Sequence, residues 1–371
     1  MTPHCARGIG LGALLCALGA PLDADATELS GSLRAGLEYD SNPLRRFESA
    51  PDAGEGSGAG GVEVVPQAIE TDVAAKVSGA VDAAWEVSET SEARLQARAG
   101  LRKLLEYDSE DALVWQAAAS QSWLAGDRWS HRIELDGKGR LERAARRDYA
   151  RAGGRWVAAW SHADWTLESS LGFSAFAYLP DPDLGWTGPA AQVEAIWAPS
   201  EAWELRASYG PSLRLSPDGA GEPSHAAQLR AQCLTGPLLL EGGYAFVRSE
   251  SSAVRYQHQV VDLSVGALLF ESTMLRARGM IQRTTYPSSV DLASVDDAAA
   301  PELAVEDENR NQVSVSLEQP LGAGLSLETR YAGLFQSLAT PGDDRTFARH
   351  IGYVGLAWTW RAGQGDDEEP R

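Results

Sequence analysis

The sequence predicts an all-β protein, a transmembrane antiparallel up-and-down β-barrel of about 16 strands. Three observations support this fold class. Apolar and polar residues alternate along most of the chain, which is the period of a strand with one apolar side. Short breaks divide the alternation into segments of similar length, and tryptophans recur beside these breaks. A membrane interface selects such a ring of aromatic residues, because indole has an apolar body and a polar N–H.

The tryptophans mark the chain at nearly equal steps. Trp85, Trp123, Trp160 and Trp197 are 38, 37 and 37 residues apart, and Cys233 lies close to the next step. A unit of this length accommodates one strand up and one strand down. Tryptophans that flank each turn would then lie at one height. The expected aromatic girdle consists of Trp85, Trp123, Trp129, Trp160, Trp165, Trp197, Trp203, Trp358 and Trp360.

Residues 1–26 have the pattern of a secretory signal peptide. Arg7 supplies a positive charge, residues 9–18 are apolar, and Ala24-Asp25-Ala26 is a cleavage site of the small-x-small type. Removal of this segment takes away one basic and two acidic residues, so the formal charge changes from -20 to -19. A chain this acidic offers no basic face to nucleic acid. We therefore expect one barrel domain over residues 27–360 and no nucleic-acid partner.

Residues 72–87 give the clearest strand. Odd-numbered positions there are valine, alanine, glycine or tryptophan, while the charged residues stand at even-numbered positions. A helix would distribute those charges around its circumference. The pattern repeats in residues 93–102, where the arginines occupy even-numbered positions. The same alternation predicts strands over residues 113–123, 165–175, 203–209, 261–269 and 325–331.

A turn centred on Thr90 would pair the first two of these strands. Glu86 then lies opposite Arg94, and Asp82 lies opposite Arg98. Opposite charges that face each other across strands help to set the register. We therefore expect the charged sides of the strands to line a wet interior, where such pairs neutralise one another.

The breaks between strands fall into two sets. The short breaks, which lie beside the tryptophans, are 88–91, 124–128, 161–164, 198–202, 234–237, 271–272 and 318–324. The breaks that are long or rich in glycine, proline and aspartate are 40–63, 179–185, 216–224 and 284–309. Outer-membrane barrels have short periplasmic turns and longer outer loops, so the tryptophans are expected on the periplasmic side. Merging the weak segments 129–136 and 147–160 would give 14 strands, and dividing the loop 284–309 would give 18.

The end of the barrel region carries a family pattern. Gly355-Leu356-Ala357-Trp358-Thr359-Trp360 resembles the terminal signal of outer-membrane barrels, Gly-x-x-aromatic-x-aromatic. That signal usually ends the chain, whereas here the acidic segment 361–371 follows, which we expect to be a disordered tail. The resemblance implies insertion by the barrel-assembly machinery into the outer membrane of a Gram-negative bacterium. The expected lipid partners are outer-membrane lipid and lipopolysaccharide.

A second resemblance lies near the start of the chain. Gly36-Leu37-Glu38-Tyr39-Asp40-Ser41-Asn42-Pro43 looks like the first strand of large outer-membrane barrels that open with Gly-x-x-Tyr-Asp-x-Asn-Pro. This group includes porin-like barrels and barrels associated with exopolysaccharide export or surface-protein display. Their export role implies periplasmic partners. The simpler interpretation is structural, because aspartate, asparagine and proline end strands and shape turns.

Charged residues of both signs share the inward side of the predicted strands. The expected lumen-lining residues are Asp72, Asp82, Glu86, Arg94, Arg98, Arg102, Arg151, Arg155, Glu194, Arg206, Arg276 and Arg330. Mixed charge fits a transverse field across a pore, and it fits equally a salt-bridged interior that is nearly closed. The sequence leaves both interpretations open.

Catalytic and metal-binding candidates are few. Barrel hydrolases combine histidine with serine or aspartate. The residues that could combine in this way near the outer rim are His225, His258, Ser224, Ser251 and Ser252. The acidic residues of segment 291–308 could attract Ca²⁺ or Mg²⁺, but their spacing matches no calcium loop. We expect no enzyme activity, no metal site and no cofactor.

Three functions fit these observations to different degrees. The leading hypothesis is an outer-membrane channel or export pore for solutes, whose working parts are the lumen charges. The second is a structural barrel in an envelope machine for polysaccharide export or surface assembly. The third is a barrel hydrolase. Conductance in a planar bilayer separates the first from the second, and hydrolysis of lipid or peptide substrates identifies the third.

Overall fold

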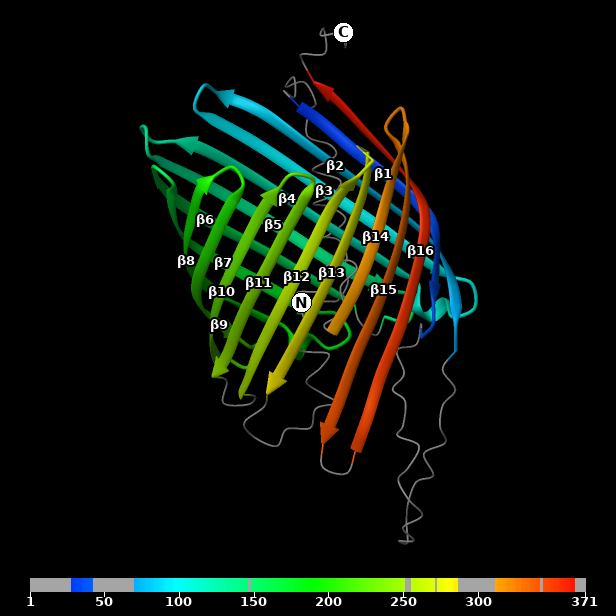
Figure 1. Cartoon of the computed structure of the whole chain (residues 1–371). Coiled ribbons are helices and arrows are strands. Elements are labelled where there is room, and N and C mark those ends of the chain that lie inside the picture. The colour runs from blue at the N-terminus through cyan, green and yellow to red at the C-terminus, as the bar shows by residue number, and fades with distance from the viewer. Residues whose placement is uncertain are drawn as a thin grey trace.

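Sixteen antiparallel strands form a closed barrel in the computed structural model (Figure 1). Each strand pairs with its neighbours in the chain, and β1 pairs with β16 to close the wall. The predicted fold class and strand number are therefore confirmed. The structure describes residues 28–42, 70–145, 148–250, 255–270, 272–285, 311–340 and 343–363. In these ranges no helix is long and apolar enough to cross a membrane.

The strands are 12 to 21 residues long. Their bounds are β1 (Glu28–Asp40), β2 (Asp72–Ser88), β3 (Ser91–Leu104), β4 (Ala112–Leu124), β5 (Trp129–Glu142), β6 (Tyr149–His162), β7 (Trp165–Tyr178), β8 (Trp186–Ser200), β9 (Trp203–Leu215), β10 (Gly221–Thr235), β11 (Leu238–Glu250), β12 (Arg255–Leu269), β13 (Thr273–Thr285), β14 (Asn311–Gly322), β15 (Leu325–Thr340) and β16 (Asp343–Gly363). Two 3₁₀ helices, η1 (Asp108–Glu110) and η2 (Pro182–Leu184), lie in connections. The expected signal peptide, residues 1–26, lies outside the described residues.

The two ends of the barrel differ in their connections. At the upper end in Figure 1, where β1 begins and β16 finishes, the turns contain only two to four residues; we call this the short-turn end. The opposite end, which we call the loop end, has the connections 41–71 and 286–310. It also has the two-residue connection 341–342, so the loop-end connections vary widely in length. The acidic segment 291–308 is outside the described residues.

The weak segments of the sequence form two separate strands. The first continues from residue 136 through Glu142 as β5, and the second is β6. Glycines concealed the apolar side of β5. At Gly139 the indole of Trp115 from β4 occupies the space that a Cβ would need. The apolar surface at this point therefore comes from the neighbouring strand, which a single-strand pattern cannot show.

The predicted register between β2 and β3 is wrong by two residues. Arg94 does not lie opposite Glu86. The same displacement separates Arg98 from Asp82. Two changes add up to this displacement. The turn is centred between Glu89 and Thr90, with Ser88 opposite Ser91, and an irregularity between Glu86 and Ser88 leaves one residue of β2 without a partner in the register, as in a β-bulge. Because the displacement is even, both strands keep their predicted faces, and Asp82 still reaches Arg94 diagonally at 2.5 Å.

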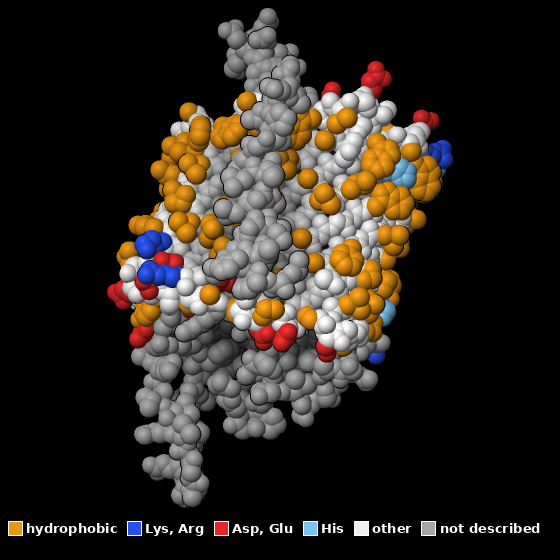
Figure 2. All heavy atoms as spheres, turned by 180° about the vertical axis from the view of Figure 1, so that it is seen from behind, with side chains coloured by type: hydrophobic (Ala, Val, Ile, Leu, Met, Phe, Trp, Pro, Cys, Tyr) orange, Lys and Arg blue, Asp and Glu red, His pale blue; other side chains and the backbone are white. Residues whose placement is uncertain are grey.

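The outward side of the wall is apolar. Leu33 of β1 is 50% exposed and Leu171 of β7 is 61% exposed, and valine, leucine and aromatic side chains stand at equivalent positions on other strands. Figure 2 shows apolar side chains over the outer surface, with charged side chains gathered towards the two ends. In water such a surface would be unfavourable. This apolar surface fits the hydrocarbon of a bilayer. The residues at the alternate positions of each strand therefore face the interior of the barrel.

Substitutions at two consecutive residues of β1 test this assignment of faces. Leu33→Arg places a charge in lipid near the middle of the strand and is expected to cost about 2–4 kcal/mol or to block assembly. Ser32→Arg places the same charge beside an interior cavity that Ser32 lines, and it should be tolerated. The measurement is the yield of heat-modifiable, folded protein in membranes. Equal loss in both variants would contradict the faces.

Candidate functional site

The inward positions of the strands carry the charged side chains. The strand registers place all of the expected lumen residues on this side of the wall. They do not form one continuous site. Three cavities along the inner wall and one buried network near the loop end divide them, and the four groups differ in how far their charges are paired.

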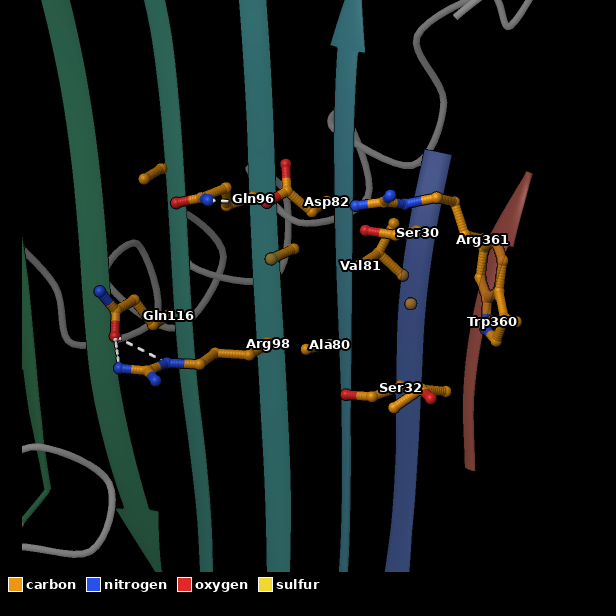
Figure 3. A pocket seen from close by; sticks show the side chains of 14 residues that line it. Ser30, Ser32, Ala80, Val81, Asp82, Gln96, Arg98, Gln116, Trp360 and Arg361 are labelled. Carbon is orange, nitrogen blue, oxygen red and sulfur yellow. Dashed lines mark hydrogen bonds between the residues drawn. The ribbon is translucent and has the colours of Figure 1, made fainter. Parts of the chain in front are cut away.

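One cavity, about 770 Å³, lies along β16 and β1 to β4 (Figure 3). Asp82 accepts hydrogen bonds from Arg94 Nε at 2.8 Å and Gln96 Nε2 at 2.9 Å. Arg98 extends along the wall and donates from Nε to Gln116 Oε1 at 2.9 Å. Among the described residues, Arg98 has no carboxylate partner. Its positive charge is therefore not neutralised locally.

A second cavity, about 350 Å³, is lined by β5 to β9 and is salt-bridged. Glu134 accepts hydrogen bonds from both Arg132 and Arg155. Arg206 lies 2.5 Å from Glu204 and 3.6 Å from Glu194. The guanidinium groups here are occupied by carboxylates of the same strand or a neighbouring one, so this part of the wall carries little uncompensated charge.

A third cavity, about 460 Å³, lies along β9 to β13 and is lined by both arginines and carboxylates. On its β13 side the arginines and carboxylates are not closely paired. Arg276 and Arg278 of β13 line it together with Asp262 of β12. Neither arginine forms an ion pair with another residue in the described ranges. The expected residue Arg330 lies further along the wall, with its guanidinium 5.9 Å from the Tyr353 ring centroid.

The buried network lies at the loop end, where β1 meets β16. Asp40 is fully buried and Arg349 is 2% exposed. Arg349 donates from Nε to Asp40 Oδ1 at 2.9 Å, and its Nη2 and Arg102 Nη2 both reach Asp40 Oδ2. Arg102 Nε also lies 2.7 Å from Glu38, which is 3.5 Å from Lys76. Buried charges require such mutual pairing, because each has lost its water.

Arg102 and Asp72 therefore do not act as open lumen charges. Arg102 belongs to the buried network. Asp72 is 5% exposed, and its carboxylate accepts the backbone N–H groups of Val73, Glu106 and Tyr107 at 2.6, 3.0 and 3.0 Å. It anchors the connection after β3 to the start of β2. Position parity placed both residues on the inward side of the barrel. It could not distinguish a side chain exposed to the interior from one buried in contacts with other residues.

The two family-like motifs of the sequence meet where β1 pairs with β16, and we call this contact the seam. Gly36 of the first motif lies directly opposite Gly355 of the second. The Tyr353 ring occupies the space that a Cβ on either glycine would need. Lys76 lies 5.8 Å from the same ring, within cation–π range. A larger residue at Gly36 or Gly355 would displace Tyr353, so both glycines serve the closure of the wall.

The remainder of the first motif shapes the chain after β1, as the structural interpretation expects. The Asn42 backbone N–H donates to Asp40 Oδ1 at 3.0 Å, and Asn42 Nδ2 donates to Ala348 O at 3.3 Å. Ser41 and His350 exchange hydrogen bonds at 3.0 and 2.8 Å. The motif thus ends the strand and also fastens it to β16, and its last residue, Pro43, lies outside the described residues.

The expected girdle residues stand near the short-turn end. Trp129 lies opposite Trp160, and Trp165 lies opposite Trp197 with ring centroids 6.1 Å apart. Cys233 lies opposite Trp203, where the regular spacing places an aromatic residue. The other members occupy the corresponding ends of their strands: Trp85 on β2, Trp123 on β4, and Trp358 and Trp360 on β16. β16 continues to Gly363, three residues into the expected tail.

His225 and Ser224 do not come together. His225 points outward and its Nδ1 is 2.7 Å from the Tyr209 hydroxyl, whereas Ser224 faces inward and lies 2.7 Å from the Ser212 hydroxyl. His258 stands on the inward side of β12. Ser251 and Ser252 are outside the described residues. In the described part of the chain, no group of three or more histidine, cysteine, aspartate and glutamate side chains is placed to hold a metal ion.

Sequence reasoning missed several inward charges. Arg132 lies in residues 129–136, one of the two weak segments of the sequence. Arg230 shares its parity with Gln228 and Gln232, so alternation within residues 226–232 was an available signal. Arg349 gave no sequence signal, because its partner Asp40 is 309 residues away.

Comparisons with known proteins support the fold alone. No family model matches the sequence, and no curated protein matches it. The structure of Salmonella typhi OmpF in complex with daunomycin is 10% identical, covers 91% of this chain and 99% of its own, and gives a TM-score of 0.51. A TodX monoaromatic hydrocarbon channel is 10% identical over 92% of this chain and 91% of its own, with a TM-score of 0.43. A bacterial polysaccharide outer membrane secretin is 14% identical over 90% and 98%, also with a TM-score of 0.43.

Removal of one partner tests the buried network. Asp40→Leu removes the carboxylate that Arg349 and Arg102 share inside the wall, and the expected cost is about 3–5 kcal/mol. The measurement is the temperature at which the folded, heat-modifiable band converts to the unfolded band. Tyr39→Leu, at the adjacent outward position, is the control and should change this temperature little. A similar temperature for Asp40→Leu and wild type would show that the network does not secure the seam.

Proposed function

We propose that the protein is a channel in the outer membrane of a Gram-negative bacterium and that it conducts small polar solutes. The observation that carries the proposal is the division of the wall, apolar outside and charged inside, in a closed barrel. An apolar exterior calls for lipid, and rings of charged side chains on an inner wall attract water and ions. The fold shared with OmpF supports the proposal without identifying a solute.

The proposal includes a route and an orientation. A cleaved signal peptide would take the chain to the periplasm, and the barrel-assembly machinery would insert it among outer-membrane lipid and lipopolysaccharide. The girdle tryptophans at the short-turn end favour the periplasmic interface for that end. The loop end would then face outward. The alternative, a closed barrel within an export or assembly machine with periplasmic partners, predicts no conductance from the isolated protein.

Many wall charges are neutralised by partners on the same strand or a neighbouring one, so ion selectivity should depend on the unpaired arginines. Arg98 is the clearest case, because among the described residues it bonds an amide and no carboxylate, and it lines the cavity of about 770 Å³. Its outward-facing neighbour Ala97 stands on the same strand. The pair allows a direct test of whether the interior is wet.

Cysteine substitution at these positions probes access from water. In a Cys233→Ser background, Arg98→Cys should react with a small charged thiol reagent, whereas Ala97→Cys should resist it because its side chain faces lipid. Mass spectrometry of protein in liposomes measures the labelled fraction. Equal labelling at both positions would mean that the interior is not an aqueous path distinct from the membrane.

Charge reversal at the same position probes conduction. Arg98→Glu changes one wall charge by two units and should shift the reversal potential of a planar bilayer toward cation selectivity. Glu92→Gln, nearer the short-turn end of the same strand, removes one negative charge and should produce a smaller shift in the opposite direction. If Arg98→Cys labels but wild type shows no conductance, the lumen is wet and blocked, and the machine-component hypothesis replaces the channel.

A further inference from the structure

Two arginines on the inner face of β13 differ from the salt-bridged arginines of the wall. Arg276 and Arg278 are separated by one residue, so they stand on the same face about 7 Å apart along the strand. Arg94, Arg132, Arg155 and Arg206 each hydrogen-bond a carboxylate of the wall. Arg276 and Arg278 bond none in the described part of the chain. They are therefore cations with donor groups available to a solute.

The side chains opposite the two arginines are small and mostly hydroxylic. On β14, Ser314 lies opposite Arg278 and Ser316 lies opposite Arg276. On β12, Ser264 lies opposite Arg278, and a glycine lies opposite Arg276. Directly opposite side chains lie about 5 Å apart at Cβ. Two guanidinium groups are thus flanked by three hydroxyls.

The acidic side chains nearest to this patch turn away from it. Asp262 of β12 lies over Gly243 of β11, where its Oδ1 occupies the space that a Cβ would need. Glu318 of β14 accepts a hydrogen bond from Ser326 of β15 at 2.9 Å. Each carboxylate is therefore directed to the strand on its far side. Glu241, which also lines this cavity, is two strands away from β13.

We propose that Arg276 and Arg278, with the hydroxyls of Ser264, Ser314 and Ser316, bind the oxyanion group of a passing solute, such as a phosphate or sulfate ester. Guanidinium groups present paired N–H donors that match the oxygens of such groups, and hydroxyls complete their hydrogen bonding. This inference rests on the proposed channel, because it names the class of solute that the channel would carry. The binding site itself can be tested without conduction.

The first measurement is equilibrium binding of inorganic phosphate to the folded, detergent-solubilised full chain by isothermal titration calorimetry at low ionic strength. The double variant Arg276→Gln, Arg278→Gln should weaken binding at least about tenfold, because two charge-assisted contacts are lost. The variant Arg276→Lys, Arg278→Lys keeps the charge without the paired donors, and its affinity should fall between these two. Folding of each variant is checked by heat-modifiable migration.

The matched control is Arg132→Gln, Arg206→Gln, which removes the same number of positive charges from arginines already occupied by carboxylates. It should retain phosphate binding within about threefold. Equal weakening in the control and in the β13 variant would show a diffuse field instead of a site, and absence of binding to wild type would also overturn the inference. Conductance in planar bilayers then separates the two proposals. If phosphate binds but no conductance appears, the proposed channel is rejected and the oxyanion site stands. If conductance appears but phosphate does not bind, the oxyanion site is rejected and the channel stands.

Discussion

Closure of β1 onto β16 is the constraint on which the remaining structure depends. In hydrocarbon an unpaired backbone N–H or C=O costs several kcal/mol, so a wall of strands cannot have a free edge. The two strands pair along the whole length of β1. Side chains secure this ladder at successive heights. Trp360 packs over Gly31 near the short turns, Tyr353 covers the glycine pair at the centre, and Asp40 binds Arg349 at the loop end.

The sequence was sufficient for the features that depend on local period. Strand number and the two faces follow from alternation, which each strand shows by itself. Register was less accessible. The turn centred between Glu89 and Thr90 and the bulge after Glu86 together move Arg94 by two residues, and nothing in the alternation indicates either. The buried network was inaccessible for a different reason, because Asp40 and Arg349 come together only when the first and last strands meet.

Position parity also assigned all the charged residues to one inward group, whereas the structure divides them into buried and exposed residues. Asp40 and Arg98 both occupy inward positions, but one is fully buried and the other is exposed to the interior. A buried ion pair is costly to break and contributes to closure. An exposed arginine loses little when its partner changes, so it remains available to solutes. The role of an inward charge is therefore set by its distance from the seam and by its cross-strand neighbours.

This distinction changes the meaning of the overall charge. The chain carries -20, but acidic residues are concentrated in segments such as 291–308 and the end of the chain, while the inner wall carries both signs. Much of the wall neutralises itself through pairs such as Asp82 with Arg94. Among the described residues, guanidinium groups without a carboxylate partner remain on β3 and on β13. An acidic connection at the loop end would concentrate cations at that mouth, whereas the unpaired arginines favour anions inside. In the proposed channel, opposite preferences in series would discriminate against simple salts and favour a solute whose charged groups can reach specific side chains on the wall.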